Sequence, residues 1–114
     1  MTVRLIHVIA ASSCAMAIAA AAFGAHSAQG YAVEWLHTGG EYQLIHGVAA
    51  IVIADRADGP ALLLLLGSFV FAVTLYAMAL GAPRWFGAIT PIGGVLMILG
   101  WLWFAYRASP SRNA

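Results

Sequence analysis

The sequence predicts an all-α integral membrane protein, a bundle of four transmembrane helices in which neighbours run antiparallel. Of its 114 residues, 63% are hydrophobic and only 8% are charged, and the mean hydropathy is +0.91. A soluble domain of this length has too little interior to bury so many apolar side chains. A helix of about 20 apolar residues satisfies its own backbone hydrogen bonds and crosses a hydrocarbon layer about 30 Å thick. None of the apolar runs alternates with period two, which argues against a β-barrel.

Four apolar runs supply the helices. The predicted helices are residues 5–24, 38–55, 61–81 and 90–107, all in one domain that spans residues 1–114. The first run begins after Arg4 and ends in small residues, so it also has features of a cleavable signal peptide. Its apolar stretch is long for such a peptide, which favours a transmembrane helix.

Local signals place the helix ends. Thr38 and Glu41 fit a capping box, which would begin the second helix at Thr38. Thr90 followed by Pro91 fits an N-cap with proline in the first turn of the fourth helix. The polar residues 55–60 predict a tight turn, so the second and third helices should be antiparallel neighbours. The longer segment 24–37 either lies on the membrane surface or extends the second helix backwards.

The arginines predict the orientation. With this topology four arginines lie on the side of the two termini: Arg4, Arg56, Arg107 and Arg112. The opposite side has only Arg84. Because positive side chains favour the cytoplasmic side, both termini of this multi-pass chain are predicted in the cytoplasm.

Small residues mark surfaces for close helix packing. In lipid the hydrophobic effect does not drive helices together, so they associate through close van der Waals contact, which small residues allow. One stripe of the first helix is Ala11, Ala15, Ala19 and Phe23, and a second is Ala17, Ala21 and Ala25. Gly93 and Gly100 share a face of the fourth helix. Spacing alone leaves open whether these surfaces meet helices of the same chain or of a second copy.

Four sequence stretches together resemble a known family. They are AAFGAHSA, GEYQLIHGVA, GSFVFAVTLYAMAL and ITPIGGVLMILGW, one from each predicted helix. In this order they are similar to the YgdD/YwdK-like small membrane proteins, over nearly the whole chain. That family is a domain of unknown function. The resemblance implies a four-helix inner-membrane protein and brings no activity, substrate or cofactor.

Polar side chains in apolar helices are costly and raise functional hypotheses. The candidate functional or structural polar cluster consists of His26, Glu41, Tyr42, His46 and Tyr76. Tyr42 and His46 share one face of the second helix with Gly39 and Ala50, whereas Glu41, Ile45, Val48 and Val52 point away. We therefore expect His46 to be buried and neutral. Its expected partner is Ser12, Ser13, Tyr76 or backbone near Gly93 and Gly94, and proton relay and ligand binding are the alternative roles.

Metal and haem sites are not expected. If the second helix extends backwards, Glu34, His37 and Glu41 share a face, and Glu-x-x-His is a spacing of carboxylate-bridged metal sites. Such a site needs two of these motifs, and the chain has one. Haem needs two axial side chains at matching depth, and His46 has no histidine partner within the chain. No metal, haem or other cofactor is therefore predicted.

These observations favour a non-enzymatic protein. No nucleophile with a base and no phosphate-binding glycine loop is apparent, and the net charge of +1 offers no patch for nucleic acid. We expect a structural, accessory or assembly component of a membrane complex, or a modulator of the lipid environment. The expected partners are the lipid bilayer and a homo-oligomer or larger membrane complex. The alternative is a small homo-oligomeric proton or solute conductor that uses Glu41, Tyr42 and His46.

Overall fold

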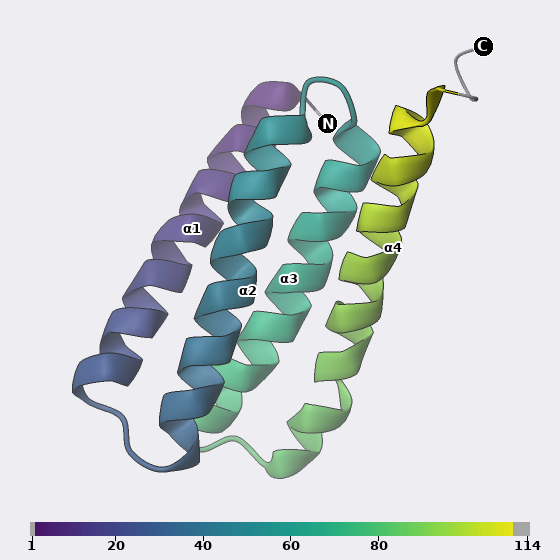
Figure 1. Cartoon of the computed structure of the whole chain (residues 1–114). Helices are drawn as coiled ribbons and strands as arrows, with labels where there is room; N and C mark the ends of the chain where they lie inside the picture. The colour runs from purple at the N-terminus through teal and green to yellow at the C-terminus, as the bar shows by residue number, and fades with distance from the viewer. Residues whose placement is uncertain (1, 111–114) are drawn as a thin grey trace.

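The computed structural model describes residues 2–110, which form four long helices and one short 3₁₀ helix. They are α1 (Val3–His26), α2 (Tyr31–Ile53), α3 (Asp58–Ala79), η1 (Arg84–Ala88) and α4 (Thr90–Ala108). Figure 1 shows the long helices side by side, with the N-terminus, the α2–α3 connection and the end of α4 together at one end. We call this the terminal end, and the opposite one the loop end. Arg112, used above to predict orientation, lies outside the described residues.

The start of α2 corrects one prediction. The capping box at Thr38 and Glu41 is wrong, because α2 already begins at Tyr31. The chain turns at Gly30, whose φ of +64° is readily adopted by glycine, and no helix breaker follows before Thr38. The segment predicted as a long loop is therefore mostly helix, as the alternative of a backward extension proposed.

The start of α4 also differs in detail. The cap position is Ile89, and Thr90 is the first helical residue, with Pro91 in the first turn. The Thr90 hydroxyl bonds to the Thr74 hydroxyl of α3 at 2.7 Å. Thr90 therefore joins two helices instead of capping its own.

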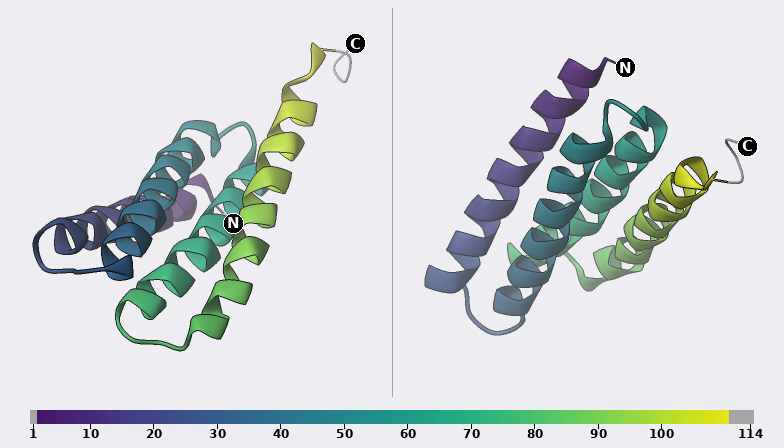
Figure 2. Two further views of the ribbon diagram at one scale, coloured as in Figure 1. Left: turned by 60° about the horizontal axis from the view of Figure 1, so that its bottom comes forward. Right: turned by 45° about the horizontal axis from the view of Figure 1, so that its top comes forward.

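The helices pack in chain order. α1 packs on α2, α2 on α3 and α3 on α4, and α1 makes a smaller contact with α3. Within residues 2–110 the backbones of α1 and α4 do not approach each other. The views in Figure 2 show that α4 tilts away from α2. The four helices therefore do not close into a bundle on the side between α2 and α4.

Glycines bring neighbouring backbones together. A Cβ on Gly93 would lie 2.5 Å from the Gly67 carbonyl oxygen and from the Phe71 nitrogen, so α3 and α4 touch through their backbones there. Gly40 and Gly47 of α2 lie close to α1, since a Cβ on them would lie 3.1 Å from the Ala17 carbonyl oxygen and 3.2 Å from the Ala10 carbonyl oxygen. The small-residue surfaces of α4 and α2 therefore pack within the chain.

The alanine stripes of α1 need a correction. The stripe containing Ala11, Ala15 and Ala19 is exposed. The buried side of α1 is formed by Ile6, Ala10, Ser13, Ala17 and Gly24. Of the second predicted stripe only Ala17 is buried, because the buried face of α1 overlaps that stripe at Ala17 and lies on the opposite side of the helix from the first stripe.

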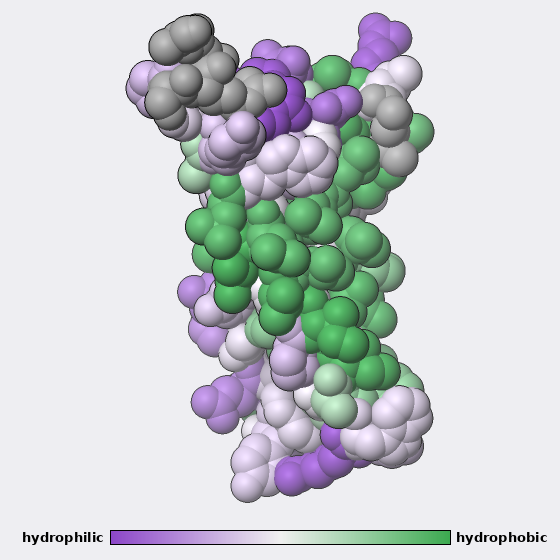
Figure 3. Space-filling view, turned by 90° about the vertical axis from the view of Figure 1, so that its right-hand side faces the viewer, coloured by the Kyte–Doolittle hydropathy of each residue, from purple (hydrophilic) through white to green (hydrophobic). Residues whose placement is uncertain are grey.

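Three of the helical segments are long and apolar enough to cross a membrane: 3–26, 58–79 and 84–108. α2 has similar length but carries Glu34, His37, Glu41, Gln43 and His46. Seen from the side of α4, an apolar band lies between polar ends (Figure 3). The chain is therefore an all-α protein with the surface of a membrane protein.

Candidate functional site

Gln43, at the middle of α2, is the centre of the first polar contact between helices. Its side chain is fully buried. Its amide nitrogen donates to the Ser13 hydroxyl of α1 at 3.0 Å and lies 3.3 Å from the Met16 sulfur. Its carbonyl oxygen accepts from the Tyr76 hydroxyl of α3 at 2.6 Å. Gln43 thus links three helices at one depth.

Glycines of α2 allow these bonds to form. A Cβ on Gly39 would lie 2.7 Å from the Tyr76 ring, so only glycine leaves space for that ring beside α2. A Cβ on Gly40 would lie 3.1 Å from the Ala17 carbonyl oxygen. Close backbone approach on both sides brings short side chains such as Ser13 within hydrogen-bond distance of Gln43.

His46, one turn after Gln43, makes the second polar contact and is 6% exposed. The indole N–H of Trp101 on α4 donates to His46 Nε2 at 3.0 Å. His46 Nδ1 lies 2.7 Å from the Tyr42 carbonyl oxygen. Because an indole only donates, Nε2 is the acceptor and Nδ1 carries the proton toward the carbonyl. This arrangement fits the expected buried, neutral imidazole.

The predicted partners of His46 were wrong. Ser13 and Tyr76 bond to Gln43 instead, and the Ser12 hydroxyl donates to the Val8 carbonyl of its own helix. The partner of His46 is Trp101, whose indole extends from α4 to α2, and the two rings meet edge to face with their centroids 5.8 Å apart.

Two grooves border these contacts. The groove between α2 and α4 has a volume of about 370 Å³ and is lined by Tyr42, His46, Phe71, Gly94, Met97, Ile98 and Trp101. The groove between α1 and α3 has a volume of about 490 Å³, and Gln43 forms part of its floor. Both walls are predominantly apolar, so each groove is suited to hydrocarbon.

A different group of polar residues occupies the outer side of α2. Glu34, His37 and Glu41 share this side because α2 starts early enough to include them. His37 Nε2 lies 3.4 Å from Glu41 Oε2, with the two side chains 75% and 55% exposed. Among residues 2–110 no three histidine, cysteine or acidic side chains converge as metal ligands do.

The five residues of the predicted polar cluster therefore separate. Tyr42 and His46 stay together, with their rings stacked at 6.1 Å, and Tyr42 also packs against Phe71 at 4.9 Å. Tyr76 faces Gln43, while Glu41 lies on the outer side of α2 and His26 is exposed at the end of α1. The structure adds Ser13, Gln43 and Trp101 to the site.

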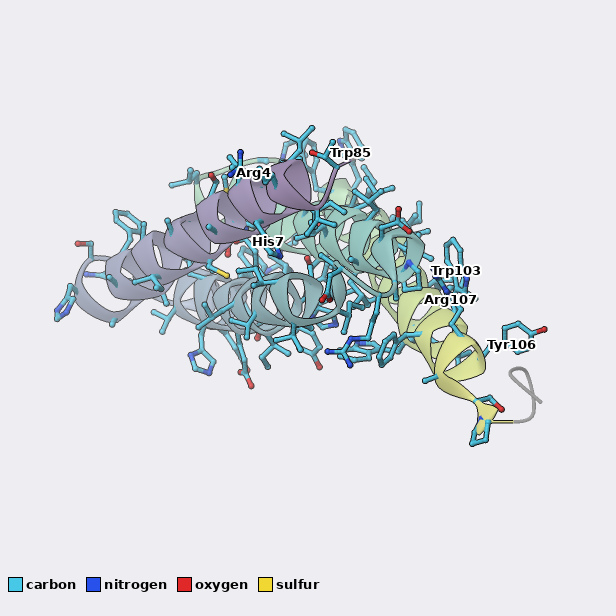
Figure 4. All side chains as sticks on the ribbon, turned by 90° about the horizontal axis from the view of Figure 1, so that it is seen from above. Arg4, His7, Trp85, Trp103, Tyr106 and Arg107 are labelled. Atoms are coloured by element: carbon cyan, nitrogen blue, oxygen red, sulfur yellow. The ribbon has the colours of Figure 1, made fainter. Side chains whose placement is uncertain are left out.

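Charged and aromatic side chains gather at the two ends of the helices. At the loop end the Arg84 guanidinium lies over the rings of Tyr31 and Trp35, at 4.8 and 5.6 Å. At the terminal end Arg107 pairs with Asp58 at 3.8 Å and donates to the Arg56 carbonyl. Figure 4 shows Arg107 near Trp103 and Tyr106 on α4, and His7 between α1 and α2.

The chemistry available at the site is hydrogen bonding between helices. Within residues 2–110 every buried side-chain nitrogen or oxygen has a partner. The Gln43 amide forms hydrogen bonds but does not ionise, so it cannot act as an acid or base. Both ring nitrogens of His46 already take part in hydrogen bonds, to Tyr42 and to Trp101. The arrangement joins helices at the centre of the molecule.

Comparison with known proteins gives a consistent family. Residues 20–94 match the family described as "Protein of unknown function (DUF423)". A "UPF0382 membrane protein" of Haemophilus influenzae is 36% identical over 107 residues, covering 84% of this chain and 86% of that protein. For "UPF0382 membrane protein SERP0230" of Staphylococcus epidermidis the identity is 37% over 107 residues, covering 83% and 87%. "UPF0382 inner membrane protein YgdD" of Escherichia coli K12 is 36% identical over 113 residues, covering 89% and 86%. No solved structure matches the chain.

Proposed function

The chain belongs to the DUF423 family, as its resemblance to YgdD/YwdK-like proteins predicted, and we propose that it is a non-enzymatic, structural component of a larger inner-membrane assembly. The observation that carries this proposal is that the central polar side chains form hydrogen bonds between helices. Ser13, Gln43 and Tyr76 bond to one another, and His46 bonds to Trp101. These side chains hold the four helices in one arrangement, which suits a scaffold.

In the proposed topology α2 is a fourth span, antiparallel to its neighbours, and both termini are cytoplasmic. The packing of α2 along both α1 and α3 supports this placement, because α1 and α3 are long and apolar enough to cross a bilayer. Arg4, Arg56 and Arg107 gather toward the terminal end, whereas Arg84 lies at the loop end. The positive-inside rule then favours a cytoplasmic terminal end.

Reporter fusions test the topology. A reporter after residue 110 should be active only in the cytoplasm, and one inserted at Gly30 only in the periplasm. A periplasmic terminal fusion together with a cytoplasmic one at Gly30 would reverse the orientation. The same location at both positions, cytoplasm or periplasm, would exclude α2 as a separate span.

Flux through reconstituted vesicles tests the function. The protein in liposomes with a trapped pH dye should leave an imposed proton gradient as stable as in empty liposomes, with no difference for His46→Gln. Purification in mild detergent should recover a stoichiometric partner or a homo-oligomer. Proton or ion leakage that His46→Gln abolishes would replace the structural role with the conducting one.

A further inference from the structure

The outer side of α2 carries one continuous exposed stripe. Its residues, spaced three or four apart, are Glu34, His37, Glu41, Ile45, Val48 and Val52. We call these six residues the α2 stripe. Such spacing keeps them on one side of the helix, and α1 and α3 cover the other sides. The stripe is charged toward the loop end and apolar toward the terminal end.

The charged part of the stripe extends to the depth of hydrocarbon at Glu41. Ile53 lies 12 residues beyond Glu41, which is a rise of about 18 Å along the helix, and a hydrocarbon layer is about 30 Å thick. Gly40, next to Glu41, contacts Ala17 and Ala21, inside the apolar run of α1. Glu41 therefore lies well inside the layer that α1 spans.

An ion pair facing lipid at this depth is unfavourable. The His37 and Glu41 side chains are 75% and 55% exposed, so the chain itself does not shield them. Ionisable groups within membrane segments normally face another helix or water, because hydrocarbon offers them no hydrogen bonds. The stripe thus has the character of an interface that lacks its partner.

We propose that the α2 stripe packs against the same stripe of a second copy of this chain. In a two-fold dimer a surface meets itself, so it must be complementary to itself. A stripe with both an acid and a base meets this condition, because Glu41 of each copy can pair with His37 of the other. Ile45, Val48 and Val52, each about half exposed, then pack along the remaining length of the helix. This inference rests on the proposal that α2 spans the bilayer.

Disulfide cross-linking tests the dimer in native membranes. In a full chain with Cys14→Ala, Val48→Cys should cross-link readily when membranes are oxidised. Leu99→Cys, on the outer side of α4, is the matched control because Leu99 is 49% exposed and Val48 50%. Equal cross-linking at the two positions would overturn the proposal.

The charged part is tested by dimer affinity. Energy transfer between labelled copies at increasing lipid dilution should show association about tenfold weaker for Glu41→Gln, which loses a charge-assisted bond. Exchanging the pair, with His37→Glu and Glu41→His together, should restore association because the stripe remains self-complementary. Asp55→Asn, in the α2–α3 turn, should have no effect. Unchanged association of Glu41→Gln would overturn the pairing.

A labelling control separates the dimer from the topology. Val48→Cys should resist a membrane-impermeant maleimide in intact cells and in broken membranes. If it resists labelling but does not cross-link, the dimer is wrong and the spanning of α2 stands. If it labels freely, the placement of α2 and the dimer fall together.

Discussion

The polar residues on the two sides of α2 differ in burial and in hydrogen bonding. On the inner side Gln43 and His46 are buried, and every nitrogen or oxygen of their side chains has a hydrogen-bond partner. The partners lie on neighbouring helices, except that His46 Nδ1 bonds to the Tyr42 carbonyl in the preceding turn of α2. On the outer side His37 and Glu41 pair with each other, with no further partner among residues 2–110, and remain exposed. The same helix therefore contains a completed set of contacts and an incomplete one.

The difference shows how polar residues in an apolar helix can be interpreted. In hydrocarbon, a polar side chain is tolerated when another group satisfies its hydrogen bonds. The inner side meets this condition within one chain, so its residues should determine folding stability. The outer side meets it only with a partner, so its residues should determine association.

The largest expected effect tests the packing that makes the inner contacts possible. Gly93→Ala should destabilise the fold by about 1–3 kcal/mol, because the new Cβ would overlap the α3 backbone and push α4 outward. Gly94→Ala is the matched control, since a Cβ there meets nothing within 4 Å. Unfolding in mixed detergent measures both. Equal loss in the two variants would show that α4 does not depend on close backbone contact.

The next effect concerns the centre of the inner side. Gln43→Leu should lower the free energy of unfolding by about 2 kcal/mol, because it leaves the Ser13 and Tyr76 hydroxyls without their buried hydrogen-bond partner. Ser12→Ala removes a hydroxyl bonded only within α1 and should cost less than about 0.5 kcal/mol. If unfolding in detergent gives the two variants equal stability, the inner contacts do not stabilise the fold.

A smaller effect is expected at His46. His46→Gln should be more stable than His46→Leu by about 1 kcal/mol, because an amide oxygen can still accept from the Trp101 indole. Trp101 fluorescence should change more in the Leu variant, since its N–H then loses its acceptor. Identical unfolding midpoints and spectra would contradict the His46–Trp101 bond.

Much of the fold follows from the sequence, and the reasons are physical. Apolar runs of membrane length predict helices because no other backbone conformation satisfies its hydrogen bonds in lipid. The turn at residues 55–60 was also predicted, and the structure has α2 end at Ile53 and α3 begin at Asp58. The start of α2 was misplaced because a capping-box pattern also occurs inside helices, where Thr38 and Glu41 are simply one turn apart.

The site was harder to predict because it depends on which helices meet. The face of His46 was identified from spacing, and its burial is confirmed. Its partner was missed because Trp101 lies near the aromatic end of α4, and only its long indole side chain, not the backbone of α4, comes within reach of His46 on α2. Gln43 offered a signal that could have been used, since an amide in the middle of an apolar helix requires partners on both its oxygen and its nitrogen.

The smallest expected effect on folding belongs to the outer side of α2. Glu41→Gln should change the unfolding free energy of the monomer by less than about 0.5 kcal/mol, because exposed ion pairs contribute little and the substitution removes the ion pair with His37. Unfolding in detergent at a protein concentration low enough to keep copies apart measures this value, with Gln43→Leu as the reference for a buried change. The same Glu41→Gln variant should weaken association in bilayers, where the exposed pair meets hydrocarbon. A monomer destabilised as strongly by Glu41→Gln as by Gln43→Leu would remove the distinction between the two sides of α2.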